Sequence, residues 1–257
     1  MTTKHNTSRR SFLRRAGVAA TGMLVAGCDA LSQSPGFVKL LGAAEHVSHS
    51  VQRALTPRRS MAQEFSEADL SPSFRSNGTD DPDDARYQSL AQNGFADWRL
   101  EVDGLVEQSA QLSIEQLRAM RSRTQITRHD CVEGWSAIGK WKGVPLGKVL
   151  ALVRPKPAAR YVVFHCADPM DSAGTRYYES IDMEDAYHPQ TILAYELNDA
   201  PLPIANGAPL RVRIERQLGY KMAKYIMRLE VVESFAHIGA GRGGFWEDQG
   251  YEWYAGI

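Results

Sequence analysis

Thr124-Gln-Ile-Thr-Arg-His-Asp-Cys131-Val-Glu-Gly-Trp-Ser136, followed by Trp141-Lys-Gly-Val-Pro-Leu146, is the most specific stretch of this 257-residue chain. At its centre, Cys131 offers a thiolate, which is a soft and strongly donating ligand suited to transition metals. We expect the basic neighbours Arg128 and His129 to bias the thiol toward the thiolate. Taken alone, however, a cysteine beside basic residues is more often an inert, half-buried thiol. The rest of the sequence therefore has to decide between the two interpretations.

The N-terminus has the form of an export signal. Ser8-Arg-Arg-Ser-Phe-Leu-Arg14 is a twin-arginine pattern, and the apolar stretch at 16–26 is too short to span a bilayer. The stretch closes with Leu24-Val-Ala-Gly-Cys28, which resembles a lipobox, so we expect Cys28 to carry a diacylglycerol that anchors the protein stably. The alternative is an ordinary thiol behind a plain cleavage site. Asp29 is typical of retention at the inner membrane, so the expected location is periplasmic and lipid-anchored.

Composition favours one catalytic domain. Without residues 1–27 the chain keeps 25 basic and 30 acidic side chains, a net charge of about −5, which does not suggest a nucleic-acid partner. The remaining 230 residues can bury a sizeable core. With Cys28 lipidated, Cys131 and Cys166 are the two cysteines left, and in an oxidising compartment a disulfide between them is an alternative to separate roles.

The expected organisation has three parts. Residues 1–27 form the signal peptide, 28–95 a membrane-proximal tether with an irregular lead-in, and 96–257 the catalytic domain, with cofactor contacts beginning near 75. Apolar residues at helical spacing predict a helix over 37–55 within the tether. Prolines and the acidic run at 80–84 then indicate irregular, solvated chain.

The catalytic domain is expected to be α+β with a mixed sheet. Ser113 and Gln116 form a capping box ahead of a short helix over 114–120. Alternating and apolar runs predict strands over 98–102, 161–166, 191–197, 210–214 and 225–232, with further helices over 146–153 and 183–187. The interleaving is irregular, which favours a mixed sheet over a doubly wound fold.

Two glycine-containing segments in the second half could hold an anion. Asn206-Gly-Ala-Pro-Leu-Arg211 places an amide and a guanidinium at a strand start, and Gly219-Tyr-Lys-Met-Ala-Lys224 is a turn with backbone N–H groups and lysines. By themselves such segments are more often a turn and a solvated basic edge.

Two other patterns are weaker. The glycine motif of dinucleotide-binding folds is matched by Gly239-Ala-Gly-Arg-Gly-Gly244. Too few residues follow it for the crossover helix and second strand that such a fold needs, so we expect a turn into an aromatic C-terminal tail. The histidines at 129, 165, 188 and 237 show no zinc-type spacing, and we expect them to be hydrogen-bonded structural residues.

Taken together, the segments around Cys131, 206–211 and 219–224 resemble the sulfite oxidase-like molybdopterin enzymes, in particular the periplasmic bacterial branch that includes the catalytic subunit of methionine sulfoxide reductase. The resemblance spans about 75–233 and implies the mixed-sheet molybdopterin-binding fold of that family. It also implies that Cys131 is the metal ligand of a molybdenum–molybdopterin cofactor with one pterin dithiolene. Glu133 would lie close to the metal and modulate protonation there; the alternative is a surface carboxylate beside Trp135.

The resemblance also implies which residues contact the pterin. Carried over position by position, the expected contacts are Asn77, Cys166, Asn206, Arg211, Met222, Ala223 and Lys224. Met222 and Ala223 would contribute through their backbone. Cys166 departs from the family pattern, because it falls near a position where a relative has a cofactor-contacting threonine.

The implied function is oxygen-atom transfer on a small S- or N-centred substrate, either sulfite-type oxidation or sulfoxide or N-oxide reduction. The protein orients the reactants and the cofactor supplies the chemistry. A twin-arginine substrate crosses the membrane folded, which suits a cofactor inserted in the cytoplasm. No haem-attachment motif is present, so electrons are expected from a membrane b-type cytochrome or, alternatively, a soluble cytochrome. The competing interpretation is a lipid-anchored binding or assembly protein that retains the fold without turnover.

Overall fold

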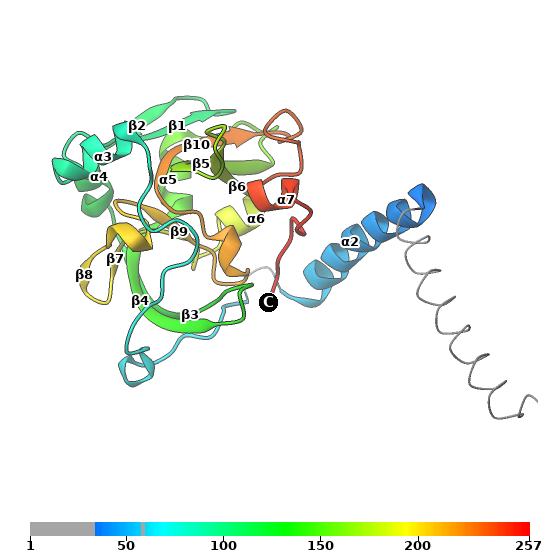
Figure 1. Ribbon diagram of the computed structural model, residues 1–257, viewed down its shortest axis with the longest axis horizontal. Helices are drawn as coiled ribbons and strands as arrows, with labels where there is room; N and C mark the ends of the chain where they lie inside the picture. Colours follow the sequence, from blue (N-terminus) through cyan, green and yellow to red (C-terminus); the bar gives the residue numbers. More distant parts are fainter. Residues whose placement is uncertain (1–33, 58–59) are drawn as a thin grey trace, which may run out of the picture. The chain divides into compact units, whose positions relative to one another are not determined.

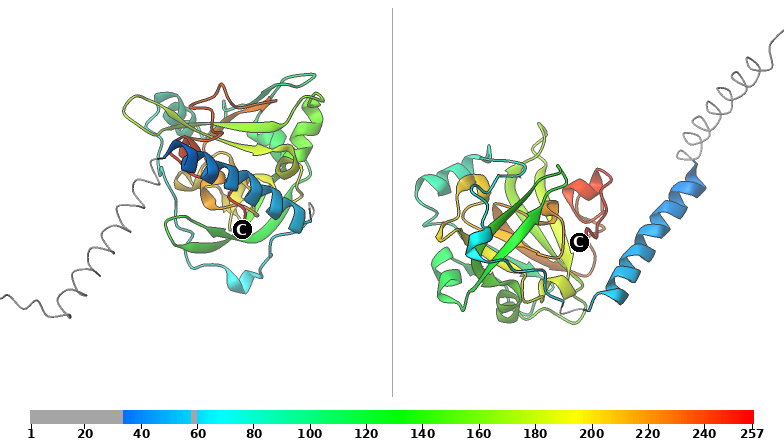
Figure 2. Two further views of the ribbon diagram at one scale, coloured as in Figure 1. Left: turned by 90° about the vertical axis from the view of Figure 1, so that its right-hand side faces the viewer. Right: turned by 90° about the horizontal axis from the view of Figure 1, so that it is seen from below.

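The computed structural model describes residues 34–57 and 60–257, which form two units that divide after Leu55. The described part of the first unit is α2 (Pro35–Leu55), drawn in blue in Figures 1 and 2, so the predicted helix is confirmed. Its apolar residues Leu40, Val47 and Val51 are exposed. No helix in the described ranges has both the length and the apolar character needed to cross a membrane. The twin-arginine pattern and Cys28 lie outside the described residues.

The second unit, Thr56–Ile257, is built on two five-stranded sheets. The first has the order β2-β1-β10-β5-β6, in which β1 and β10 run parallel and the other neighbours antiparallel. Its strands are β1 (Leu100–Gly104), β2 (Ala110–Leu112), β5 (Tyr161–Pro169), β6 (Arg176–Asp182) and β10 (Ile226–Val232). Mixed pairing with interspersed helices confirms the predicted α+β fold class.

The second sheet is antiparallel and has the order β3-β4-β7-β8, with β9 also paired to β7. Its strands are β3 (Arg123–Asp130), β4 (Ser136–Pro145), β7 (Ile192–Leu197), β8 (Ala200–Pro201) and β9 (Arg211–Arg213). Figure 1 shows β3 and β4 as one long curved hairpin. Cys131 lies in the turn of this hairpin, so the pairing of β3 with β4 sets its position.

Short helices connect the strands of this unit. They are η1 (Glu67–Asp69), α3 (Ala85–Gln92), α4 (Ile114–Ala119), α5 (Leu146–Val153), α6 (Met183–Ala186), η2 (Ile204–Asn206), η3 (Gly219–Lys221) and α7 (Phe245–Asp248). The predicted capping box is present at α4, where the Gln116 N–H donates to Ser113 Oγ (3.2 Å) and the Ser113 N–H donates to Gln116 Oε1 (2.8 Å). Helix α5 has the predicted bounds.

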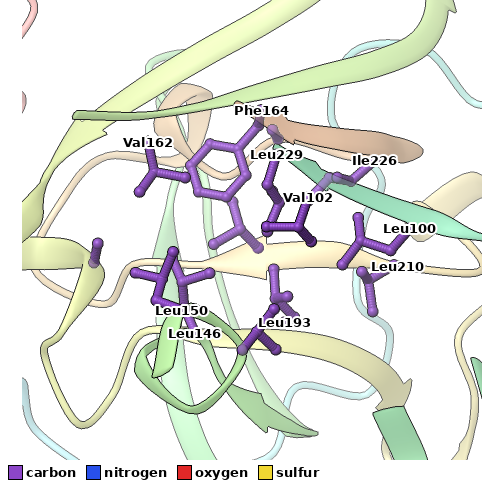
Figure 3. Packing of buried hydrophobic residues seen from close by; sticks show 14 of the residues in the cluster. Leu100, Val102, Leu146, Leu150, Val162, Phe164, Leu193, Leu210, Ile226 and Leu229 are labelled. Carbon is purple, nitrogen blue, oxygen red and sulfur yellow. The ribbon is translucent and has the colours of Figure 1, made fainter. Parts of the chain in front are cut away.

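The main core lies between the two sheets. Figure 3 shows side chains of both sheets and of α5 meeting in one cluster, among them Leu100, Val102, Leu146, Leu150, Val162, Phe164, Leu193, Leu210, Ile226 and Leu229. All of these are fully buried. Burial of each such side chain stabilises the folded state by roughly 1.5–3 kcal/mol. This core fixes the two sheets relative to each other, and with them the strands and loops that carry the site residues.

Residues 60–95 pack on the same unit rather than standing away from it. The Gln190 side-chain amide accepts from the Ala62 N–H (2.7 Å) and donates to the Ala62 carbonyl (3.0 Å). Phe74 meets Trp141 edge to face at 4.9 Å, and the buried Tyr87 hydroxyl donates to the Ala208 carbonyl (2.7 Å). The segment therefore reaches the site with its residues in defined positions.

Candidate active site

A pocket of about 150 Å³ opens where the β3–β4 turn, the loop after η3 and the loop at 76–79 meet. Its walls are Asn77, Thr79, Cys131, Val132, Glu133, Asp168, Met170, Tyr177, Gly219, Tyr220, Met222, Ala223, Lys224, Trp246 and Tyr251. Six residues singled out from the sequence are among them: Asn77, Cys131, Glu133, Met222, Ala223 and Lys224. Segments far apart in the chain are thus brought to one pocket.

The turn that carries Cys131 is closed by its own backbone. The Cys131 N–H donates to the Trp135 carbonyl (2.9 Å), and the Gly134 N–H donates to the Cys131 carbonyl (3.0 Å). Gly134 has φ +82°, in the left-handed region that favours glycine. Within the turn, the Trp135 indole N–H donates to Glu133 Oε2 (2.9 Å), which orients this carboxylate where it lines the pocket.

The surroundings of the Cys131 thiol differ from the expectation. Burial raises its pKa and the Glu133 charge adds to this, while backbone N–H groups of Glu133 and Val132 oppose it. Arg128 is paired with Asp130 (3.0 Å). The predicted bias toward thiolate from the basic neighbours is therefore wrong. Metal binding itself deprotonates a coordinating thiol, so the ligand role does not need that bias.

His129, the other basic neighbour, is a buried structural residue, as predicted. The Arg213 guanidinium donates to its Nδ1 (3.0 Å), which places the ring proton on Nε2. Burial, aided by the charge of Arg213, lowers the pKa of His129 well below its ordinary value, so the ring is neutral. Gly219 packs directly on this ring, where any Cβ would overlap it. This contact holds the end of β3 against the loop that begins at Gly219.

Arg211 ties the two glycine-containing segments together from behind the pocket wall. It is fully buried and donates to the carbonyls of Asn206 (3.0 Å) and Met222 (3.1 Å). Burial and the charge of Arg213 lower the pKa of Arg211 to about 9. At Gly207, with φ +108°, a Cβ would crowd both Arg211 and Lys224. The two segments predicted to form one cradle are therefore adjacent in the fold.

Lys224 supplies the positive charge on the pocket wall. Its ammonium donates to Ser76 Oγ (3.2 Å), the Ala205 carbonyl (2.9 Å) and the Thr79 carbonyl. These bonds hold the loop that carries Asn77. Burial, and next the charge of Arg211, lower the pKa of Lys224 to about 7. Burial raises the pKa of the facing Asp168 to about 6.

The residues around the pocket fit a polar cofactor. Asn77 Oδ1, Asp168 Oδ1, Asn206 Nδ2 and Arg211 Nε are buried and lack a hydrogen-bond partner within the described part of the chain. Each unpaired buried group costs about 1–3 kcal/mol. A pterin offers both donors and acceptors that would pair with them, and the Cys131 thiol is a ligand suited to its metal. The donor set and the unpaired atoms are therefore compatible with molybdopterin.

Cys166 is a predicted site residue that lies in the core. It is fully buried in β5 within the main cluster and does not line the pocket. Burial raises the pKa of its thiol well above the ordinary value. Neither Cys131 nor Cys166 forms a disulfide, so that alternative is wrong for the described structure.

Several lining residues were not predicted to belong to a site. Asp168 and Tyr177 come from β5 and β6, and Trp246 and Tyr251 come from the C-terminal tail. The sequence predicted an aromatic C-terminal tail, and the composition of this tail was the one signal for this wall. The Gly239–Gly244 pattern leads into the four-residue helix α7 rather than a dinucleotide-binding helix.

Comparison with known proteins identifies the family of this chain. The model of the family described as oxidoreductase molybdopterin binding domain matches residues 88–237. The chain belongs to this family. It is therefore a molybdopterin-dependent oxidoreductase of the sulfite oxidase type, as the sequence predicted, and its mixed sheets and helices form an α+β fold.

Among the relatives, a protein of Azospira oryzae named as a protein-methionine-sulfoxide reductase subunit, YedZ1, is 38% identical over 97% of this chain and 88% of its own length. The protein-methionine-sulfoxide reductase catalytic subunit MsrP of Xanthomonas axonopodis pv. citri is 37% identical over 62% of this chain. Only 52% of that relative is covered, so the chain spans about half its length. The MsrP of Ralstonia nicotianae is 32% identical over 88% of this chain and 69% of its own length.

A solved structure with weaker similarity is the sulfane dehydrogenase SoxCD of Paracoccus pantotrophus. It superposes with a TM-score of 0.48 at 22% identity, over 54% of this chain and 39% of that chain.

Proposed function

We propose that this member of the molybdopterin oxidoreductase family reduces sulfoxides, with methionine sulfoxide as the substrate class. The observation that carries the proposal is the charge of the pocket. Glu133 and Asp168 line it, whereas Lys224 is the one cationic lining residue in the described chain and already donates to three acceptors. Anionic sulfite would face two carboxylates, whereas a neutral sulfoxide would not be repelled. The names of the relatives, which refer to methionine sulfoxide reductases, support the same direction.

In this proposal the chain holds molybdopterin with residues of the pocket and the wall behind it. Cys131 provides the thiolate ligand of the metal. Asn77, Asn206, Arg211 and Lys224, together with the backbone of Met222 and Ala223, hold the pterin and its phosphate. We leave Cys166 out of this set because the core encloses it. When bound, the cofactor supplies two-electron oxygen-atom transfer with a single pterin dithiolene.

Glu133 is proposed to move the protons of the reaction. Reduction of a sulfoxide to a sulfide takes up two electrons and two protons and releases water. The Trp135 indole holds Glu133 Oε2, and the carboxylate lines the pocket beside Cys131. A carboxylate so placed can deliver protons to the departing oxygen.

The N-terminal sequence supports a proposal for the cellular location and, through it, for the electron donor. We propose that the folded protein is exported by the twin-arginine route, is anchored at the inner membrane through a lipid on Cys28, and works in the periplasm. Its electron donor is then a membrane b-type cytochrome, with a soluble cytochrome as the alternative. The names of the relatives, which call them subunits, support a partner protein.

Two measurements on the purified full chain test the proposed function. Metal and pterin analysis should find molybdenum and molybdopterin. With a reduced viologen as electron donor, the holoprotein should reduce methionine sulfoxide and should not oxidise sulfite with an artificial acceptor. Sulfite oxidation without sulfoxide reduction would refute the proposed direction. A cofactor-loaded protein without turnover on sulfoxides, N-oxides or sulfite would favour the binding or assembly protein instead.

A further inference from the structure

The C-terminal segment folds back to complete the pocket, which Trp246 and Tyr251 line. The Leu218 N–H donates to the Ala255 carbonyl (2.9 Å), and the Ile257 N–H donates to the Arg216 carbonyl (3.0 Å). Nearer the pocket, the Tyr178 hydroxyl donates to Asp248 Oδ2 (2.5 Å). Figure 1 shows α7 beside β6, where Gly244 bridges to Glu179. The segment is thus attached on both sides of α7.

A buried cluster of three ionisable groups forms the centre of this attachment. Lys221 Nζ lies 2.5 Å from Glu179 Oε1 and 2.6 Å from Glu247 Oε1, and all three residues are fully buried. Burial and the charge of Glu247 raise the pKa of Glu179 well above its ordinary value. A proton held on Glu179 leaves one carboxylate and one ammonium, which makes the cluster neutral. Gly244 leaves room for it, because a Cβ there would overlap Glu247.

The cluster joins two parts of the pocket wall through neighbours in the sequence. Lys221 stands between the lining residues Tyr220 and Met222, and Glu247 follows the lining residue Trp246. Holding Glu247 on Lys221 therefore fixes Trp246 relative to the loop after η3. The Tyr177 hydroxyl, which donates to the Tyr220 carbonyl, secures the same loop from β6.

Three aromatic side chains form one wall of the pocket. Trp246 and Tyr251 have ring centroids 5.4 Å apart with an interplanar angle of 30°, and Tyr251 meets Tyr220 edge to face at 5.2 Å. The Tyr251 N–H donates to the Trp246 carbonyl (3.0 Å), which closes the turn between them. Tyr251 is 41% exposed, so this wall runs from inside the pocket to its rim.

We propose that Trp246 and Tyr251 bind the apolar substituent of the S-oxide substrate, and that the Lys221–Glu179–Glu247 cluster is the positioning device for them. The inference rests on the proposed sulfoxide reduction and deepens it. Cys131 and Glu133 stand on the wall where the oxygen is transferred, whereas the aromatic wall offers ring faces and edges to methyl and methylene groups. Binding strength should therefore grow with the size of the apolar substituent.

Steady-state kinetics of the holoprotein with dimethyl sulfoxide, free methionine sulfoxide and a methionine sulfoxide peptide tests this wall. Trp246→Ala and Tyr251→Ala should each raise KM for methionine sulfoxide about tenfold while kcat stays within about twofold, and the effect on dimethyl sulfoxide should be smaller. Tyr187→Ala is the matched control, because Tyr187 is similarly exposed (50%) and lies outside the pocket. Unchanged KM in both wall variants, with an active wild type, would overturn the proposal.

Two readouts separate this inference from its alternatives. Molybdenum and pterin content should be the same in Trp246→Ala as in wild type; loss of cofactor would mean that the wall holds the pterin instead of the substrate. Tryptophan fluorescence of the wild type should change on titration with methionine sulfoxide, and Trp246→Phe should remove that change. A wild type that turns over no sulfoxide would instead overturn the proposed function, which is a distinct result.

Discussion

Replacing Lys221 with methionine should destabilise the protein strongly, because it leaves two buried carboxyl groups without their cation. Both ion pairs of Lys221 are fully buried, at 2.5 and 2.6 Å. Removing one partner from such a site costs about 3–5 kcal/mol. For a unit of this size, each kcal/mol lowers the melting temperature by about 2–4 °C, so Lys221→Met should lower it by roughly 6–20 °C.

The loss should depend on pH in a defined direction. The pKa of Glu179 is raised in the folded state, so its contribution to stability is fully present below the unfolded value of 4.5 and is lost as the pH rises through the folded value. Without Lys221 to offset the charge, both carboxyls must stay protonated or remain as buried anions. The free energy of unfolding that Lys221→Met loses relative to wild type should therefore be small near pH 5 and large near pH 8. Thermal and denaturant unfolding, followed by circular dichroism, measures this difference.

Glu247→Gln is the matched control for Lys221→Met. With glutamine at 247, Glu179 is the single carboxyl group left facing Lys221, and the amide still offers an oxygen to Lys221. We expect this variant to lose no more than about 1 kcal/mol. A loss of stability equal to that of Lys221→Met, with no dependence on pH in either variant, would refute the protonated Glu179 and the neutral cluster.

The remaining predictions concern the ligand, the cofactor cradle and the anchor. Cys131→Ser should fold with pterin bound yet lose the sulfur-to-metal absorption and nearly all turnover, whereas Cys166→Ser should keep both; equal activity of Cys131→Ser and wild type would exclude the ligand role. Since the pKa of Lys224 is lowered to about 7, the side chain loses its positive charge as the pH rises through 7. Cofactor uptake by the cofactor-free protein should therefore fall between about pH 6 and pH 8. Lys224→Met should give low uptake at both pH values, as measured by molybdenum and pterin content. Full loading of Lys224→Met would contradict that assignment. In cells, Cys28→Ala should abolish lipid labelling, and lysines in place of Arg9 and Arg10 should leave a cofactor-loaded precursor in the cytoplasm; unchanged labelling or unchanged export would refute the anchor or the route.

The parts of the fold that the sequence predicted are those whose buried faces are apolar. Helix α5 and strands β5, β7 and β10 place valine, leucine and isoleucine in the core. The hairpin of β3 and β4 was missed, although it carries Cys131. Strand β3 turns Gln125, Thr127 and His129 inward, and all three are fully buried. A strand whose inward face is polar gives no alternation of apolar residues, so its period cannot be recognised.

The candidate site was predicted in part for a related reason. The segments around Cys131 and at 219–224 were recognised from their local sequence motifs, and the fold brings both to the pocket. Asp168 and Trp246 were not assigned to it, because their membership depends on how β5 and the C-terminal segment fold back. The charge state of Cys131 was mispredicted because Arg128 turns to Asp130 and because burial keeps His129 neutral. The sequence neighbours of a charged residue do not predict which group it pairs with in the folded protein.

The buried polar side chains that prevent β3 from being predicted from the sequence also hold the pocket in shape. The Gln125 amide donates to Glu215 Oε1 (2.8 Å), Glu215 pairs with Arg213, and Arg213 donates to His129, two residues before Cys131. An apolar strand would fold as well but would leave the Cys131 turn free to shift along its partner. Directional hydrogen bonds join β3 to Arg213 of β9 and to Glu215 just after it, and they restrict that movement. Unpaired buried partners are costly enough to enforce the register. A strand that positions a metal ligand in this way departs from the apolar pattern because its inward side chains have to bond to specific partners.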